Sequence, residues 1–118
     1  MTNTSPVESL DFDALLELLD RTTMREVVQM FVDSVPTRIA TARGGLAASD
    51  AAIVATAFHT LRSGCGQLGA RRLEELCAEG EREAKNAGLD GTAMRLRDIE
   101  VEFARCLAWF REHGWVDA

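Results

Sequence analysis

The sequence lacks the features on which several kinds of metal site and crosslinked fold depend. Its three cysteines are odd in number and show no C-x-x-C spacing. The sequence therefore indicates neither a disulfide framework nor a zinc site, and we expect reduced thiols in the core. It contains no E-x-x-H or H-x-x-x-H pair and no acidic cluster that suggests magnesium binding. We expect no intrinsic metal and no other intrinsic cofactor.

Clustered positive charge and long apolar runs are missing as well. The formal net charge is -6, and the arginines are scattered among carboxylates. This pattern argues against a nucleic-acid surface, because phosphate contacts need clustered Lys and Arg. No window approaches the ~20 apolar residues of a membrane span, and the beginning of the chain has neither the basic nor the apolar region of a secretion signal. We expect a cytoplasmic protein that binds neither nucleic acid nor membranes.

Nucleotide-binding motifs are also missing. The sequence has no P-loop and no glycine-rich kinase box. Both motifs hold the phosphates of a nucleotide, so their absence predicts a chain that does not phosphorylate itself from ATP.

The sequence does contain a succession of amphipathic helices, and no segment alternates like a strand. Residues 1–9 are polar and predict a flexible lead-in, whereas residues 10–118 predict one domain. Pro36 should kink or break the second helix. The expected helices run from Asp11 or Asp13 to about Asp20, from Thr22 or Thr23 to about Leu46, from Ser49 or Asp50 to Gly66 or Leu68, from about Ala70 to Ala87, and from about residue 92 to His113.

Four of these helices are long and are joined by short connections. Such a pattern is typical of an antiparallel, up-and-down four-helix bundle, to which the short first helix is an addition. We therefore predict an all-α fold, and we expect a monomer.

His59 lies outside the apolar stripe of its helix. On a helical wheel the apolar residues fall in an arc centred roughly 130° to 150° away from it. A lone histidine on a helix is most often a solvated side chain, but a solvated face usually carries long charged residues. Here the neighbours are nearly all small, and Gly64 costs a helix up to ~1 kcal/mol relative to alanine. The neighbours one and two turns away are Ala55, Thr56, Arg62, Ser63 and Gly66.

An exposed imidazole beside a guanidinium suits phosphoryl chemistry. A neutral ring nitrogen is a nucleophile at physiological pH, and Arg62 could hold a phosphoryl group by charge-assisted hydrogen bonds. The residues therefore favour a nucleophilic His59 that another protein can approach.

The segment HTLRSGCGQLGARRLEELCAEGE, which starts at His59, resembles the core motif of histidine-containing phosphotransfer (HPt) domains. That motif reads approximately H-x-L-K-G-S-S-x-x-L-G-A-x-x-L-x-x-L-C-x-x-x-E. The sequence departs from it twice: Arg62 stands where the family usually has lysine, and Ser63 and Gly64 reverse a Gly-Ser pair. The matching residues are His59, Leu61, Leu68, Gly69, Ala70, Leu73, Leu76, Cys77 and Glu81.

The resemblance implies a phosphorelay intermediate. His59 would accept a phosphoryl group from the aspartyl phosphate of a receiver domain in a hybrid sensor kinase, and would pass it to the aspartate of a response regulator. Arg62 would contact the phosphoryl group. Glu81 would bond Nδ1 and orient the imidazole, with Gln67 as the next candidate for that role. Magnesium would be bound by the receiver domain.

The resemblance also implies an apolar docking patch near the histidine, because receiver domains dock on the family partly through such a patch. The first helix has more leucines than one buried face needs. An alternative is a helical adaptor that binds or sequesters a receiver domain without carrying phosphate. The expected partner-binding residues are Leu15, Leu18, Leu19, Ala55, Thr56, Ser63, Gly66 and Gln67.

Overall fold

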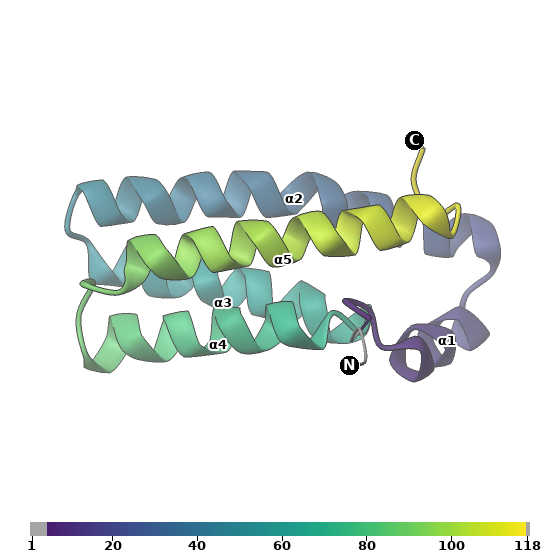
Figure 1. Cartoon of the computed structure of the whole chain (residues 1–118), viewed down its shortest axis with the longest axis horizontal. Coiled ribbons are helices and arrows are strands. Elements are labelled where there is room, and N and C mark those ends of the chain that lie inside the picture. Colours follow the sequence, from purple (N-terminus) through teal and green to yellow (C-terminus); the bar gives the residue numbers. More distant parts are fainter. Residues whose placement is uncertain (1–4, 118) are drawn as a thin grey trace.

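The computed structural model describes residues 5–117, which form five α-helices and no strand. Figure 1 shows four long helices side by side, connected at alternate ends, with the short first helix across one end. The predicted all-α fold is confirmed. The helices are α1 (Ser9–Leu18), α2 (Arg21–Ala47), α3 (Ala51–Gln67), α4 (Arg71–Asn86) and α5 (Thr92–Glu112).

Asp20 sets the start of α2. Its Oδ1 accepts a hydrogen bond from the backbone N–H of Thr23 at 2.7 Å, which satisfies one of the free donors of the first turn. The predicted cap at Thr22 or Thr23 is therefore wrong, because an aspartate placed earlier supplies the cap. The helix then continues past Pro36 to Ala47 without a break.

Asp50 begins α3 and is one of the two caps that the sequence predicts. Its Oδ1 accepts a hydrogen bond from the N–H of Ile53 at 3.1 Å. The other candidate, Ser49, has a positive φ of 54° and forms the turn that separates α2 from α3.

Helix α1 begins and ends earlier than predicted. Glu8 is its N-cap and accepts from the N–H of Leu10, so the predicted caps at Asp11 and Asp13 are wrong. The helix ends at Leu18, which leaves Asp20 free to begin the next helix.

Residues 5–8 differ from the flexible lead-in that the sequence predicts. Val7 is fully buried, and the N–H of Glu8 donates to the carbonyl of Gly69 at 2.7 Å. Gly69 has a φ of +76°, and a Cβ there would lie 2.6 Å from the carbonyl oxygen of Glu8. Glycine therefore allows the lead-in to dock on the turn between α3 and α4. Residues 1–4 of the predicted lead-in lie outside the described residues.

Two further contacts hold α1 against the bundle. Phe12 packs edge-to-face against Trp109 and Trp115, with ring centroids 5.3 Å and 5.1 Å away. Asp11 forms an ion pair with Arg71 at the start of α4. Together these contacts hold α1 against the end of α5 and the start of α4.

A glycine brings α3 and α4 close together. A Cβ on Gly80 would lie 2.9 Å from Cε2 and 3.0 Å from Cδ2 of Phe58, a fully buried ring. Glycine inside a helix costs about 1 kcal/mol relative to alanine, so this close packing accounts for its presence. His59 and Glu81 directly follow the two contacting residues.

We predict that alanine has opposite effects at two helical glycines. Gly80→Ala should lower the free energy of unfolding by about 1–2 kcal/mol, because overpacking by the new methyl group exceeds its gain in helix propensity. Gly44→Ala should raise it by up to about 1 kcal/mol, because no atom lies within 4 Å of its Cβ position. Chemical denaturation of both variants provides the measurement. Equal stabilities would contradict the close contact at Gly80.

Candidate functional site

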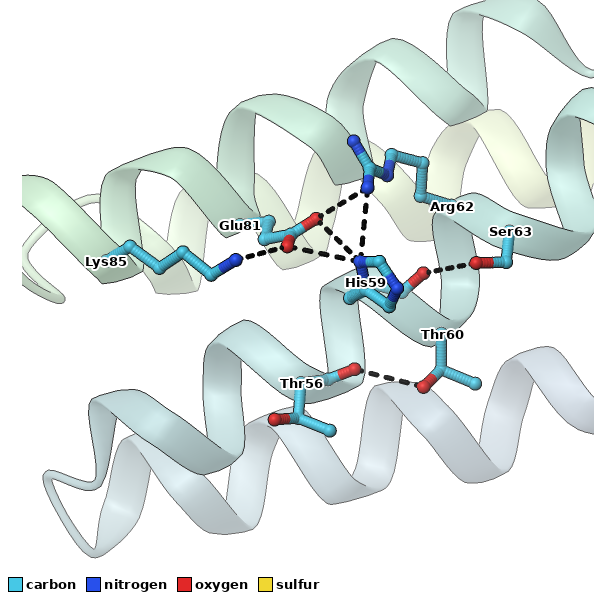
Figure 2. Close-up of polar contacts among 7 residues, drawn as sticks. All are labelled: Thr56, His59, Thr60, Arg62, Ser63, Glu81 and Lys85. Atoms are coloured by element: carbon cyan, nitrogen blue, oxygen red, sulfur yellow. Dashed lines mark hydrogen bonds and ion pairs between the residues drawn. The ribbon is translucent and has the colours of Figure 1, made fainter.

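His59 lies on α3 with 55% of its side chain exposed. Its Nδ1 faces α4 and lies 3.2 Å from Oε2 and 3.4 Å from Oε1 of Glu81. Figure 2 shows the other ring nitrogen, Nε2, on the side of the ring turned away from that carboxylate. The structure thus brings together the histidine and the glutamate that the sequence pairs, with Nε2 directed away from the bundle.

Glu81 is a buried carboxylate with two cationic neighbours. Its side chain is 7% exposed, Nζ of Lys85 donates to Oε2 at 2.7 Å, and Nη2 of Arg62 lies 3.4 Å from Oε1. The hydrogen bond from Lys85 is the main cause that holds the pKa of the Glu81 carboxyl below its usual value; burial opposes this effect, and the charge of Arg62 adds to it. Glu81 is therefore ionised at neutral pH and can accept a hydrogen bond from Nδ1.

Arg62 occupies a different side of the ring from the one that a phosphoryl contact requires. Its Nη2 lies 3.1 Å from Nδ1 of His59, next to Glu81 (Figure 2). The side chain is 39% exposed. In the described state Arg62 is a neighbour of the Nδ1–carboxylate pair.

The residues around His59 divide into two groups. Ala55, Arg62 and Gly66 lie roughly 20° to 60° to one side of His59 on the wheel, toward α4. Ala55 is only 6% exposed, so the expectation that it belongs to the open face is wrong. Gly66 is half-buried, and a Cβ there would lie 2.5 Å from Oε2 of Glu74 in α4.

The open face lies on the other side of the ring. Thr56, Ser63 and Gln67 are all exposed there. The hydroxyl of Ser63 donates to the carbonyl of His59 at 3.0 Å, and Thr60 donates in the same way to the carbonyl of Thr56. Because these hydroxyls bond their own helix, they lie back against the backbone and leave the approach to the ring open.

Gly64 does not belong to the open face. A Cβ there would lie 3.3 Å from Cδ1 of Phe31 in α2, so this glycine makes room for the neighbouring helix. Relative to the Gly-Ser pair of the family motif, the reversed order therefore places Ser63 on the exposed side and Gly64 against the core.

An apolar groove lies beside the end of α3. It has a volume of about 410 Å³, and its lining residues include Gly66 and Gln67. Gly66 follows His59 by about 10 Å along the helix, at ~1.5 Å per residue. Leu18 is 81% exposed, whereas Leu15 and Leu19 pack partly against the core. The three leucines predicted to bind a partner, Leu15, Leu18 and Leu19, all line this groove.

Two residues of the site were missed in the sequence. Lys85 follows Glu81 by four residues, a spacing that brings side chains together on a helix, and it is the single lysine of the chain. Gly80 is the second missed residue. A glycine within a helical stretch lowers helix stability, so its presence indicates close packing against a neighbouring helix. Gln67, the alternative partner for Nδ1, lines the groove, and the observed neighbours of Nδ1 are Glu81 and Arg62.

Residues 5–117 contain neither a candidate metal site nor a candidate membrane span. No group of three or more His, Cys, Asp or Glu residues in that range is placed to hold a metal ion. No helix in the same range combines the length and the apolar character needed to cross a membrane.

Comparisons with known proteins agree with this architecture. The family model of the Hpt domain matches residues 26–109, which include most of α2 and α5 and all of α3 and α4. The chain therefore belongs to the Hpt domain family, whose members carry out histidine phosphotransfer in two-component phosphorelays.

A similar solved structure is that of histidine-containing phosphotransfer protein B from Pseudomonas aeruginosa PAO1. The TM-score is 0.87 at 22% sequence identity, and the match covers 94% of this chain and 96% of that one. At this identity the likeness shows the fold. No curated protein matches the chain.

We predict that Lys85→Met raises the pKa of Glu81. The hydrogen bond and the charge of Lys85, which lower this pKa, are lost while the burial that raises it remains, so the pKa should rise. Because the folded-state pKa is lowered, Glu81 contributes stability above about pH 4.3 that is lost as the pH falls through the folded value. This acid-side loss should be smaller in the variant.

NMR titration of the glutamate carboxyl carbons measures the pKa, and denaturation between about pH 3 and 6 measures the stability. Lys85→Arg is the matched control, since it retains the charge and should retain the low pKa. An unchanged pKa in Lys85→Met would assign the shift to Arg62 instead.

Proposed function

We propose that His59 is the phosphoacceptor of this Hpt domain. The observation that carries the proposal is the exposed ring whose Nδ1 faces the buried, ionised Glu81 while Nε2 is directed outward. A carboxylate behind an imidazole selects the tautomer with hydrogen on Nδ1 and stabilises positive charge on the ring. The nucleophile is then the lone pair of Nε2.

The transfer step needs no proton movement. The Nε2 lone pair forms a bond to phosphorus, and the bond from phosphorus to the aspartyl oxygen of the donor breaks with its electron pair. The products are a free carboxylate on the receiver and a phosphoimidazolium whose Nδ1–H donates to Glu81. Two negative charges on the acyl phosphate become one on the carboxylate and one, net, on the phosphohistidine.

Arg62 and the partner supply the remaining electrostatic stabilisation. After rotating toward Nε2, the guanidinium can bond two phosphoryl oxygens, which is the bidentate geometry that arginine favours. Phosphoryl transfer is stabilised largely by positioning and electrostatics. In this proposal the receiver domain binds the magnesium ion that contributes to this stabilisation. Transfer from His59 to a response-regulator aspartate is the reverse reaction.

The partners in this proposal are the receiver domains of a hybrid sensor kinase and of a response regulator. Each would dock on the groove beside α1 and the end of α3, which places its aspartate over the open face of His59. The apolar lining and the exposed Leu18 support this surface. The protein would act as a monomer in the cytoplasm.

We predict that phosphoryl transfer depends on one of the two histidines of the chain. Incubation with a radiolabelled phosphorylated receiver domain should place acid-labile, base-stable label on the wild-type chain. His59→Gln should take up no label, because the nucleophile is gone. His113→Gln is the matched control and should be labelled normally, since His113 stacks on Trp109 at the end of the bundle.

The same assay tests Glu81 and the adaptor alternative. Glu81→Ala should bind the receiver with little change but should transfer about 10- to 100-fold more slowly, the worth of a hydrogen bond to a charged group. Label on His59→Gln would overturn the assignment of the phosphoacceptor. Tight receiver binding without any transfer by the wild type would favour the adaptor.

We predict that the groove contributes to receiver affinity. Leu18→Asp should raise the dissociation constant about tenfold or more, because a charge then faces an apolar contact. Met94→Asp is the matched control: Met94 is 59% exposed on α5, away from the groove, and its replacement should leave the affinity unchanged. Calorimetric titration with a phosphorylation-deficient receiver measures both constants. Equal affinities would place the interface elsewhere.

A further inference from the structure

Two contacts at Nδ1 of His59 exclude one another as hydrogen bonds. Nδ1 lies 3.2 Å from Oε2 of Glu81, an acceptor, and 3.1 Å from Nη2 of Arg62, a donor. A ring nitrogen of a neutral imidazole carries either a hydrogen or a lone pair in the ring plane. With the hydrogen, Nδ1 donates to Glu81; with the lone pair, it accepts from Arg62.

Each alternative fixes the state of Nε2. When Nδ1 donates to Glu81, Nε2 carries the lone pair and can attack phosphorus. When Nδ1 accepts from Arg62, the hydrogen lies on Nε2, and the only lone pair of the ring faces into the bundle. The competition at Nδ1 therefore decides whether the outward nitrogen is a nucleophile.

We propose that Arg62 holds a share of the resting His59 in the unreactive tautomer, and that a phosphoryl group arriving at Nε2 removes this restraint. The anionic oxygens draw the guanidinium away from Nδ1, which then donates to Glu81. This inference rests on the proposed function of His59 as the phosphoacceptor. Arg62 thus acts twice, first as a competitor of Glu81 and then as a phosphoryl contact.

The surroundings allow the guanidinium to leave without disturbing the carboxylate. Glu81 keeps its bond from Lys85 at 2.7 Å, on the same Oε2 that faces Nδ1. Apart from its 3.1 Å contact to Nδ1, Arg62 has only the longer 3.4 Å contact to Oε1 among the contacts of this site, and its side chain is 39% exposed. The weaker restraint is therefore on the cation that has to move.

The change of tautomer conserves protons. One proton leaves Nε2 and one is taken up by Nδ1, so the ring stays neutral and solvent both accepts and donates a proton. The ring is 55% exposed, so water can reach it to carry out this exchange.

Nitrogen-15 NMR of the neutral His59 ring tests the proposal. Arg62→Met should shift the tautomer ratio about two- to tenfold toward hydrogen on Nδ1, as expected for the net worth of one hydrogen bond. Glu81→Ala should shift it in the opposite direction, because Arg62 is then the remaining partner of Nδ1. Arg72→Met is the matched control, since Arg72 pairs with Glu75 on the exposed side of α4, and it should leave the ratio unchanged.

An unchanged ratio in Arg62→Met would overturn the proposal. Arg62→Ala provides a second variant, and circular dichroism verifies that both remain folded. The tautomer ratio is measured without any phosphoryl donor, so it is independent of the labelling assay. A changed ratio in Arg62→Met, together with no uptake of label by the wild type, would reject His59 as phosphoacceptor and leave the competition standing. Normal uptake by the wild type with an unchanged ratio in Arg62→Met would reject the competition alone.

Discussion

The close approach of α3 and α4 at Gly80 and Phe58 is the constraint on which the site depends. Because Gly80 has no side chain, the buried ring of Phe58 lies where a Cβ would come within 2.9 Å of it. The residues that follow these two, His59 and Glu81, are thereby brought to 3.2 Å. A wider separation of the two helices would break the contact between imidazole and carboxylate. The same short stretch of the α3–α4 interface therefore provides both the close packing of Gly80 on Phe58 and the contact between His59 and Glu81.

A buried carboxylate is costly unless its charge is balanced. Glu81 meets this cost with one cation from its own helix and one from α3, at 2.7 Å and 3.4 Å. The two cations are not equivalent, because Lys85 contacts only the carboxylate whereas Arg62 also contacts the ring. Under the proposed function, Lys85 stays as the counter-charge of Glu81, while Arg62 can turn to a phosphoryl group.

Helical periodicity predicts the helices and the all-α fold, because it depends on local rules. The pairing of His59 with Glu81 comes from the resemblance to the HPt core motif, in which both residues lie. The errors have physical causes. Asp20 supplies the cap in place of the threonines, and Ala55 lies on the side of α3 that is turned toward α4 and is buried. The orientation of Arg62 could not be predicted, since it depends on distances between two helices.

The attachment of α1 to the turn after α3 limits which partners can react. The hydrogen bond from Glu8 to Gly69 and the ion pair between Asp11 and Arg71 join α1, which lines the groove, to the turn that follows the helix of His59. The offset between groove and imidazole, about 10 Å along α3, is then a fixed dimension of the protein. Under the proposed function, a receiver domain is selected by shape: its reactive aspartate must stand at this offset from whatever fills the groove.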